Sequence, residues 1–394
     1  MIASINTKEE NLTSDEIKLS YLDKDFVLDC MSIPTNSKNE QRMVEFVVFW
    51  ALRNQINYEF DSYGNIYLTK GEVNDGEFFP CVTSHLDTVH GAHDPYIEVG
   101  VPLDLKIETD KDGLHKVSVE THGGSSIGVG ADDKGGVCIC LSLFSHFEKL
   151  KACFFLCEEI GCLGSKELNT EWFKDVGYVI GFDSPELHRA AWSCNGVKLF
   201  SYEFYLEHMK EVCDKWGLTT GCFFSEPYTD VTYIREKTNI ICMNFGNGGY
   251  NPHMSTEYFI LEEMDDACGM SIDLINSIGN TEHKLEHTTY KGTIYYERDD
   301  RGIYKMIDTD DSHLLAALGD NNRRTTYTTT KTSTASSTIK YESFKYVINR
   351  YESFIESLKD DILESTREYA EKNGQDLTDL EEIIKNKFNT EIKF

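Results

Sequence analysis

The chain has 394 residues and a formal net charge of −29. Such an acidic chain repels nucleic acid and anionic membrane surfaces, so neither is an expected partner. Hydrophobic residues make up 40% of the chain and aromatic residues 12%. This composition supports a substantial core and excludes an intrinsically disordered protein.

The twelve cysteines indicate reduced thiols rather than a disulfide framework. They lie between Cys30 and Cys268, several fall inside apolar runs, and no Cys-x-x-Cys pair occurs; a thiolate zinc site is the alternative. Residues 1–16 form a polar, acidic leader rather than a signal sequence, and no apolar run reaches the roughly 18 residues of a membrane span. We therefore expect a soluble, cytoplasmic protein.

The hydrophobic patterns predict alternating helices and strands over the first two thirds or so of the chain. We expect amphipathic helices at 17–31 and 39–55, two short strands within 58–68, a buried strand at 78–84 and a hairpin within 98–128. Further helices are expected at 134–149, 165–176, 197–216 and 256–278, and strands at 151–157, 177–182 and 238–244. This alternation predicts a three-layer α/β/α domain over 17–280, with a mixed, mostly parallel sheet.

The remainder of the chain has a different character. Residues 281–322 form an extension with no clear pattern, and 323–338 form a Thr/Ser-rich linker. Residues 339–394 are predicted to be helical, with an apolar stripe that includes Phe344, Val347 and Phe354. Such a stripe docks either onto the same chain or onto another copy, so self-association through this segment is an expectation.

Acidic and histidine residues gather where predicted strands end. These residues are His85, Asp87, Asp132, Asp133, Glu158, Glu159, Asp183 and His253. Open α/β sheets place their sites beyond the carboxyl ends of strands. So many carboxylates share a site only if cations compensate their repulsion. The predicted ligands for two divalent ions are His85, Asp132, Glu159, Asp183 and His253.

Each segment also has a purely structural interpretation. The alternatives are a hydrogen-bonded turn for His85 and Asp87, a helix cap for Asp132 and Asp133, solvated side chains for Glu158 and Glu159, and a loop hydrogen bond for His253. Of the two aspartates, we favour Asp132 as the bridge between ions and Asp133 as structural. Adjacent glutamates point in different directions, so one binds metal while the other handles protons.

The ordered set resembles the M20 metallopeptidase family. The segments that carry the resemblance are Ser84-His85-Leu86-Asp87-Thr88-Val89, Gly130-Ala131-Asp132-Asp133-Lys134-Gly135-Gly136, Glu158-Glu159-Ile160-Gly161, Gly181-Phe182-Asp183 and the loop 246–253. That loop and the turn Tyr63-Gly64-Asn65 look most like the peptidase T branch. The resemblance covers 17–280 and implies the zinc-peptidase (phosphorylase/hydrolase-like) fold.

The resemblance also implies how the ligands divide between two ions. Asp132 would bridge them. His85 and Asp183 would complete the site of one ion, and Glu159 and His253 that of the other. The ions would be Zn²⁺, with Co²⁺ or Mn²⁺ as alternatives.

Two further residues receive catalytic roles from the resemblance. Glu158 would act as general base and acid on a metal-bridging water, and Asp87 would orient His85. The peptide between Asp132 and Asp133 is expected to be cis.

The sequence departs from the family pattern in two places. Only about seventy residues separate Asp183 from His253, too few for the usual inserted lid or dimerisation domain. The family's Gly-Thr-Asp-Gly-Ser-Arg segment appears here within 227–233, with Tyr233 in place of the arginine that would hold a substrate carboxylate. Arg235 is nearby but out of phase. An aminopeptidase-like preference is therefore favoured.

The sequence thus predicts a metal-dependent hydrolase, a co-catalytic peptidase acting on short peptides. One alternative is an N-acyl amino acid deacylase, or another amidohydrolase, on the same scaffold. A catalytically silent binding or structural protein is the other, although binding alone would not require Glu158 beside Glu159.

Overall fold

The computed structural model describes residues 17–90, 97, 100–119, 127–285, 295–298 and 304–307. The predicted leader (1–16), linker (323–338) and helical C-terminal segment (339–394) lie outside the described residues, as does most of the extension at 281–322. These predictions stay untested.

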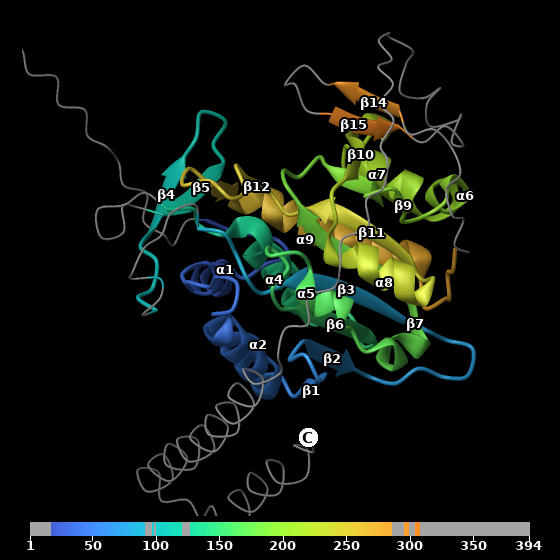
Figure 1. Cartoon of the computed structure of the whole chain (residues 1–394). Helices are drawn as coiled ribbons and strands as arrows, with labels where there is room; N and C mark the ends of the chain where they lie inside the picture. The colour runs from blue at the N-terminus through green and yellow to red at the C-terminus, as the bar shows by residue number, and fades with distance from the viewer. Residues whose placement is uncertain are drawn as a thin grey trace, which may run out of the picture. The chain divides into compact units, whose positions relative to one another are not determined.

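A nine-stranded mixed sheet forms the centre of the domain (Figure 1). In spatial order its strands are β1 (Asn57–Phe60), β2 (Ile66–Lys70), β6 (Leu150–Phe155), β3 (Phe79–His85), β7 (Val176–Ser184), β11 (Ile241–Gly246), β8 (Ala190–Cys194) and β10 (Phe223–Glu226), while β9 (Val197–Lys198) pairs with β8. The neighbouring strands β6, β3, β7 and β11 are parallel. β3 and β6 are buried along their whole length, as expected for strands covered on both faces.

Helices flank this sheet. They are α1 (Lys24–Met31), α2 (Gln41–Arg53), α4 (Ala131–Leu143), α5 (Leu163–Lys166), α6 (Tyr202–Phe204), α7 (Lys210–Lys215), α8 (Asp230–Thr238) and α9 (Leu261–Ile278), with the short turns η2 (Thr170–Asp175), η3 (Tyr205–Met209) and η4 (Thr220–Cys222). α4 packs against β3, β7, α1 and α9, whereas α8 packs against β3, β7, β11 and α5. The domain has the three-layer α/β/α architecture that the sequence predicts.

The loop that carries His253 joins two strands of a smaller antiparallel sheet. Its strands are β12 (Gly249–Tyr250), β13 (Tyr258–Ile260), β5 (His115–Val119) and β4 (Leu105–Thr109). The hairpin of β4 and β5 confirms the one predicted within 98–128. A further hairpin joins β14 (Tyr295–Arg298) and β15 (Tyr304–Ile307).

The cysteines agree with the expectation of reduced, buried thiols. All twelve cysteines are free thiols, and all except Cys222 are buried. Among the described residues, none of the helices combines the length and apolar character needed to cross a membrane.

The predicted helix at 17–31 is wrong over nearly its first half, because α1 begins only at Lys24. Asp23 caps this helix by accepting a hydrogen bond from the Phe26 N–H. The backbone N–H groups of residues 20–22 donate instead to the Asp265 carboxylate, each at 2.8 Å. This distant acceptor holds residues 20–22 in a bend instead of a helical turn.

Three other predicted helices are also corrected. The segment 256–278 is a strand followed by a helix, since β13 pairs with β5 before α9 begins at Leu261. The segment 197–216 begins with β9 and is helical only from Tyr202 to Lys215, with a π turn in the middle. The segment 165–176 is divided into α5 and η2, and the helix predicted at 134–149 ends at Leu143.

The segment between Asp183 and His253 forms no separate domain. Its strands β8, β9, β10 and β11 all join the nine-stranded sheet, and β12 joins the smaller sheet. The short spacing noted in the sequence is therefore used to extend the core.

Candidate metal centre

Three neighbouring parallel strands deliver candidate ligands to one edge of the sheet. His85 is the last residue of β3, Asp183 is the last but one of β7, and Glu158 lies three residues beyond β6. Because β6, β3 and β7 are adjacent and parallel, their carboxyl ends lie together. The loops that follow leave room there for a site.

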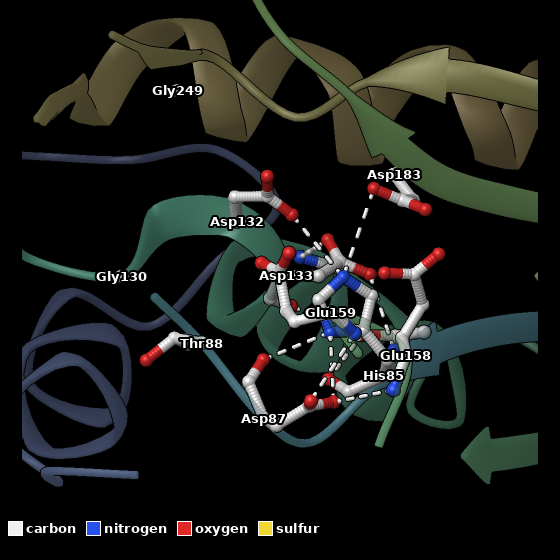
Figure 2. Close-up of polar contacts among 12 residues, drawn as sticks. His85, Asp87, Thr88, Gly130, Asp132, Asp133, Glu158, Glu159, Asp183 and Gly249 are labelled. Carbon is white, nitrogen blue, oxygen red and sulfur yellow. Dashed lines mark hydrogen bonds and ion pairs between the residues drawn. The ribbon is translucent and has the colours of Figure 1, made fainter. Parts of the chain in front are cut away.

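The imidazole of His85 faces two carboxylates (Figure 2). Its Nδ1–H donates to the backbone carbonyl of Asp87 at 2.8 Å, which fixes the tautomer because a carbonyl only accepts. The opposite nitrogen, Nε2, lies 3.1 Å from Asp132 Oδ1 and 3.7 Å from Asp183 Oδ1. The nitrogen left to bind a cation is therefore the one that faces both carboxylates.

The second histidine faces the other side of the same aspartate. His253 Nε2 lies 3.1 Å from Asp132 Oδ2 and 2.8 Å from Glu159 Oε2. The two oxygens of Asp132 thus face two different histidines. A bridging carboxylate needs this arrangement.

The charges of the site fit divalent cations. Burial raises the pKa of Glu159 to about 7. Burial and the charge of Glu158 raise the pKa of Asp183 well above its ordinary value. Hydrogen bonds to Asp132 and Glu159 raise the pKa of His253 to about 11. Burial and neighbouring charge thus penalise the ionised forms of these carboxylates, and two dications would offset that penalty without extra protons.

The two adjacent glutamates diverge as the sequence predicts, but both lie within reach of an ion. The candidate ligands form two groups, and within each group the ligand atoms lie within 4.8 Å of one another. One group is His85, Asp132 and Glu159, and the other is His85, Glu158 and Asp183. Glu158 is buried, and its Oε1 accepts the thiol hydrogen of Cys162 at 3.0 Å. Geometry alone therefore leaves Glu158 open to either of two roles, proton carrier or ligand.

Asp87 does more than the sequence predicts. Its Oδ1 accepts the Glu158 N–H at 2.9 Å and its Oδ2 the Glu159 N–H at 3.2 Å, while Ser37 Oγ donates to Oδ2 at 2.7 Å. The carboxylate is fully buried, and its oxygen Oδ1 lies 3.5 Å from His85 Nδ1, farther than the carbonyl. Its main contacts hold the turn that presents the two glutamates.

We predict that Asp87→Asn lowers kcat/KM about 10- to 100-fold, the usual effect of disturbing a partner behind metal ligands. An amide presents only one acceptor atom to two N–H groups, so the turn at Glu158 and Glu159 shifts. Ser37→Ala is the matched control, since it removes a hydrogen bond to the same carboxylate and costs only about 1 kcal/mol of stability. Equal losses of activity in both variants would contradict this role for Asp87.

Asp133 lies beside the site and has structural partners. The peptide between Asp132 and Asp133 is cis, as the family resemblance implies. Asp133 Oδ1 accepts hydrogen bonds from the Gly136 N–H at 3.1 Å and from Asn247 Nδ2 at 3.0 Å. These contacts agree with the structural role favoured from the sequence.

Two residues that support the Asp132 segment were not anticipated from the sequence. Glu257 accepts hydrogen bonds from backbone N–H groups next to Asp132, and Asn247 donates to the Ala131 carbonyl at 3.1 Å. Both contact backbone groups of this segment, so no spacing of residue types in the sequence predicts them. The only signal is that Glu257 follows His253 in the same loop.

Two basic residues that the sequence offers, Lys134 and Arg235, are already engaged. The buried Lys134 donates its Nζ hydrogens to the carbonyls of Met31 and Ile33. Arg235 is also buried and binds the carbonyls of Lys198 and Leu285. In the sequence Arg235 is near the position of the family's arginine but out of phase, and in the structure its guanidinium binds these backbone carbonyls instead.

A small pocket adjoins the centre. It is lined by Asp132, Asp183, Ser184, Pro185, Asn247, Gly249, Pro252 and Glu257. Two of these are candidate ligands, so a molecule in the pocket would lie directly beside the site.

The chain has a zinc-peptidase-like α/β fold. The structure is similar to that of a tripeptidase from Staphylococcus aureus, with a TM-score of 0.53 and 13% identity over 65% of this chain and 98% of the other. It is also similar to the aminopeptidase PepT from Bacillus cereus, with a TM-score of 0.54 and 13% identity over 66% of this chain and 100% of the other.

These similarities establish the fold. At such low identity they do not transfer substrate or mechanism. No protein-family model matches the sequence, and no curated protein matches it significantly.

Proposed function

We propose that this chain is a two-metal peptidase that cleaves residues from the amino end of short peptides. One observation carries the proposal: the two oxygens of Asp132 face His85 and His253, with Asp183 and Glu159 beside them. The zinc-peptidase fold shared with a tripeptidase and an aminopeptidase supports peptides as the substrate class.

The side chains divide the chemistry between them. Two divalent ions bound at this centre would polarise an amide carbonyl and make water acidic enough to attack it. Glu158 takes the proton of the attacking water and returns it to the leaving nitrogen. The Cys162 thiol holds one Glu158 oxygen, and Asp87 holds the Glu158 backbone, so the carboxylate is oriented before substrate arrives.

The charge around the centre favours the amino end of a substrate. The chain has a net charge of −29, far more than two dications would compensate at the centre, so the ammonium group of a peptide is attracted and its carboxylate is repelled. Arg189, which follows β7 closely in sequence, donates to Glu226 at 2.7 Å. Since this arginine is already paired, it supports no anchor for a C-terminal carboxylate.

A substrate panel tests the proposed function. Purified protein loaded with Zn²⁺, Co²⁺ or Mn²⁺ is offered di- and tripeptides with a free amine, the same peptides with an acetylated amine, and N-acyl amino acids. The proposal predicts hydrolysis of the free-amine peptides. Preferential cleavage of N-acyl amino acids would favour the deacylase alternative, and no hydrolysis by metal-loaded protein would favour a binding role.

We also predict a preference for apolar residues at the substrate's amino end. Ile160 follows Glu159 and Met254 follows His253, and the two ligands touch each other. Both apolar side chains are exposed, by 43% and 55%. Burying part of a Leu or Phe side chain against them would favour such peptides over Asp or Ser peptides by roughly tenfold in kcat/KM.

The double variant Ile160→Ser, Met254→Ser should lose this preference while hydrolysing Ala peptides as before. Leu206→Ser is the matched control, because Leu206 is equally exposed and lies on η3 beside His208. The ring of His208 packs on that of His283, and the backbone N–H of His283 donates to the Gly177 carbonyl near the start of β7. Asp183 is at the other end of β7, so Leu206 lies away from the centre. An unchanged ratio of Leu to Asp peptide hydrolysis in the double variant would contradict the prediction.

A further inference from the structure

One loop carries both a candidate histidine ligand and a glutamate that binds the backbone of another candidate ligand. The loop joins β12 to β13 and contains His253 and, four residues later, Glu257. His253 is half exposed and faces Glu159, whereas Glu257 is 2% exposed. The loop therefore reaches the centre at two points.

The buried carboxylate of Glu257 binds the backbone that supports Asp132. Its Oε2 accepts the Gly130 N–H at 2.7 Å and its Oε1 accepts the Asp132 N–H at 3.1 Å. Both oxygens are needed as acceptors, and only a carboxylate supplies two. The contact spans more than a hundred residues of sequence and joins the start of α4 to the His253 loop.

The glycine before this segment leaves room for the carboxylate. A Cβ added to Gly128 would lie 2.6 Å from Glu257 Oε2 and 2.6 Å from the Met254 carbonyl. Any larger residue at this position would push the loop away from the Asp132 segment. The close approach of the two segments thus depends on glycine at position 128.

The orientation of Asp132 depends on this contact. Asp132 turns one oxygen toward His85 and the other toward His253, so a rotation of its backbone would disturb both distances. Loss of a ligand on one side, such as His253, would weaken the binding of mainly one ion. A group that fixes the Asp132 backbone would affect both.

From this geometry we infer that Glu257 is a positioning residue that ties the bridging aspartate to the His253 loop, so that one loop serves both metal ions. The inference rests on the proposed two-metal centre and adds a residue that does not itself touch an ion. Partners behind metal ligands commonly change metal affinity by 10- to 100-fold.

Metal titration of the full chain tests the inference without any substrate. Metal-free protein is titrated with Co²⁺, whose visible absorption reports the ligand geometry, and the bound ions are counted by elemental analysis. Glu257→Gln should weaken both binding steps by about 10- to 100-fold and alter the absorption of both ions. His253→Ala should weaken mainly one step.

Glu262→Gln is the matched control. Glu262 lies five residues further on and also accepts a backbone N–H, that of His115 at 2.8 Å, but β5 carries no candidate ligand. It should bind both ions as the unmodified chain does. Gly128→Ala approaches the Glu257 carboxylate from the other side and should reproduce the effect of Glu257→Gln, which covers the case where that variant does not fold.

The outcomes separate this inference from the proposed function. If the unmodified chain binds fewer than two ions, the two-metal centre itself fails. If it binds two ions, and Glu257→Gln and Gly128→Ala bind both equally tightly, only the role of Glu257 is overturned. A loss confined to one binding step in both variants would also overturn it.

Discussion

Glu158→Gln is expected to lower kcat by about 10²- to 10⁴-fold, the usual contribution of a positioned acid–base group, while two ions stay bound. An amide matches the carboxylate in size but takes no proton from water. The Cys162 thiol remains available to hold the side chain, and Asp87 still accepts the backbone N–H at this position. Steady-state kinetics on a free-amine peptide, with elemental analysis of the same sample, measures both quantities.

This variant also decides between the two roles that geometry leaves open for Glu158. Its carboxylate lies within 4.8 Å of ligand atoms of His85 and Asp183. If Glu158 is a ligand, Glu158→Gln will lose metal along with activity. Glu159→Gln is the comparison. Because Glu159 contacts His253 and is a predicted ligand, this variant should bind less metal than Glu158→Gln does.

Asp132→Asn is expected to lose both ions and to lower activity by about 10³-fold or more, since bound metal supplies several kcal/mol of transition-state stabilisation. The amide retains one oxygen and replaces the other with a nitrogen that does not bind a cation. One of the two histidines, His85 or His253, would then lose its shared partner.

Asp133→Asn is the control for this prediction. Asp133 is adjacent in sequence and is also a carboxylate, but it faces no imidazole nitrogen. Its Oδ1 accepts hydrogen bonds from the Gly136 N–H and Asn247 Nδ2, and its Oδ2 accepts the backbone N–H of His85. We expect this variant to lose roughly 1–3 kcal/mol of unfolding free energy through an imperfect buried contact and to keep two ions. Loss of metal in Asp133→Asn with retention in Asp132→Asn would reverse the two assignments.

The convergence of the site could be predicted because the candidate residues follow short apolar runs, and parallel strands bring their carboxyl ends to one edge of a sheet. The runs that end at His85, Phe155 and Asp183 form three neighbouring parallel strands, so their carboxyl ends carry the candidate ligands to one edge. The loop position of His253 could not be derived from periodicity. It came from the likeness of its Gly/Asn-rich segment to a known family.

The contacts that position these ligands could not be predicted. Asp87 and Glu257 accept hydrogen bonds from backbone N–H groups, which every residue except proline offers, so no residue pattern marks the partner. The errors in element boundaries have a similar cause. The stretch before Lys24 is non-helical because its N–H groups bind Asp265, and Tyr258 to Ile260 form a strand because β5 is beside them.

The count of divalent ions bound per folded chain tests the central claim most directly. Protein purified without chelator, and again after chelation and reloading, is analysed by elemental analysis next to His85→Ala and His253→Ala. The account predicts two ions per chain, fewer in each variant, and peptide hydrolysis that disappears with the ions and returns with them. A chain that binds no stoichiometric metal, or that hydrolyses peptides equally well without it, would contradict the account.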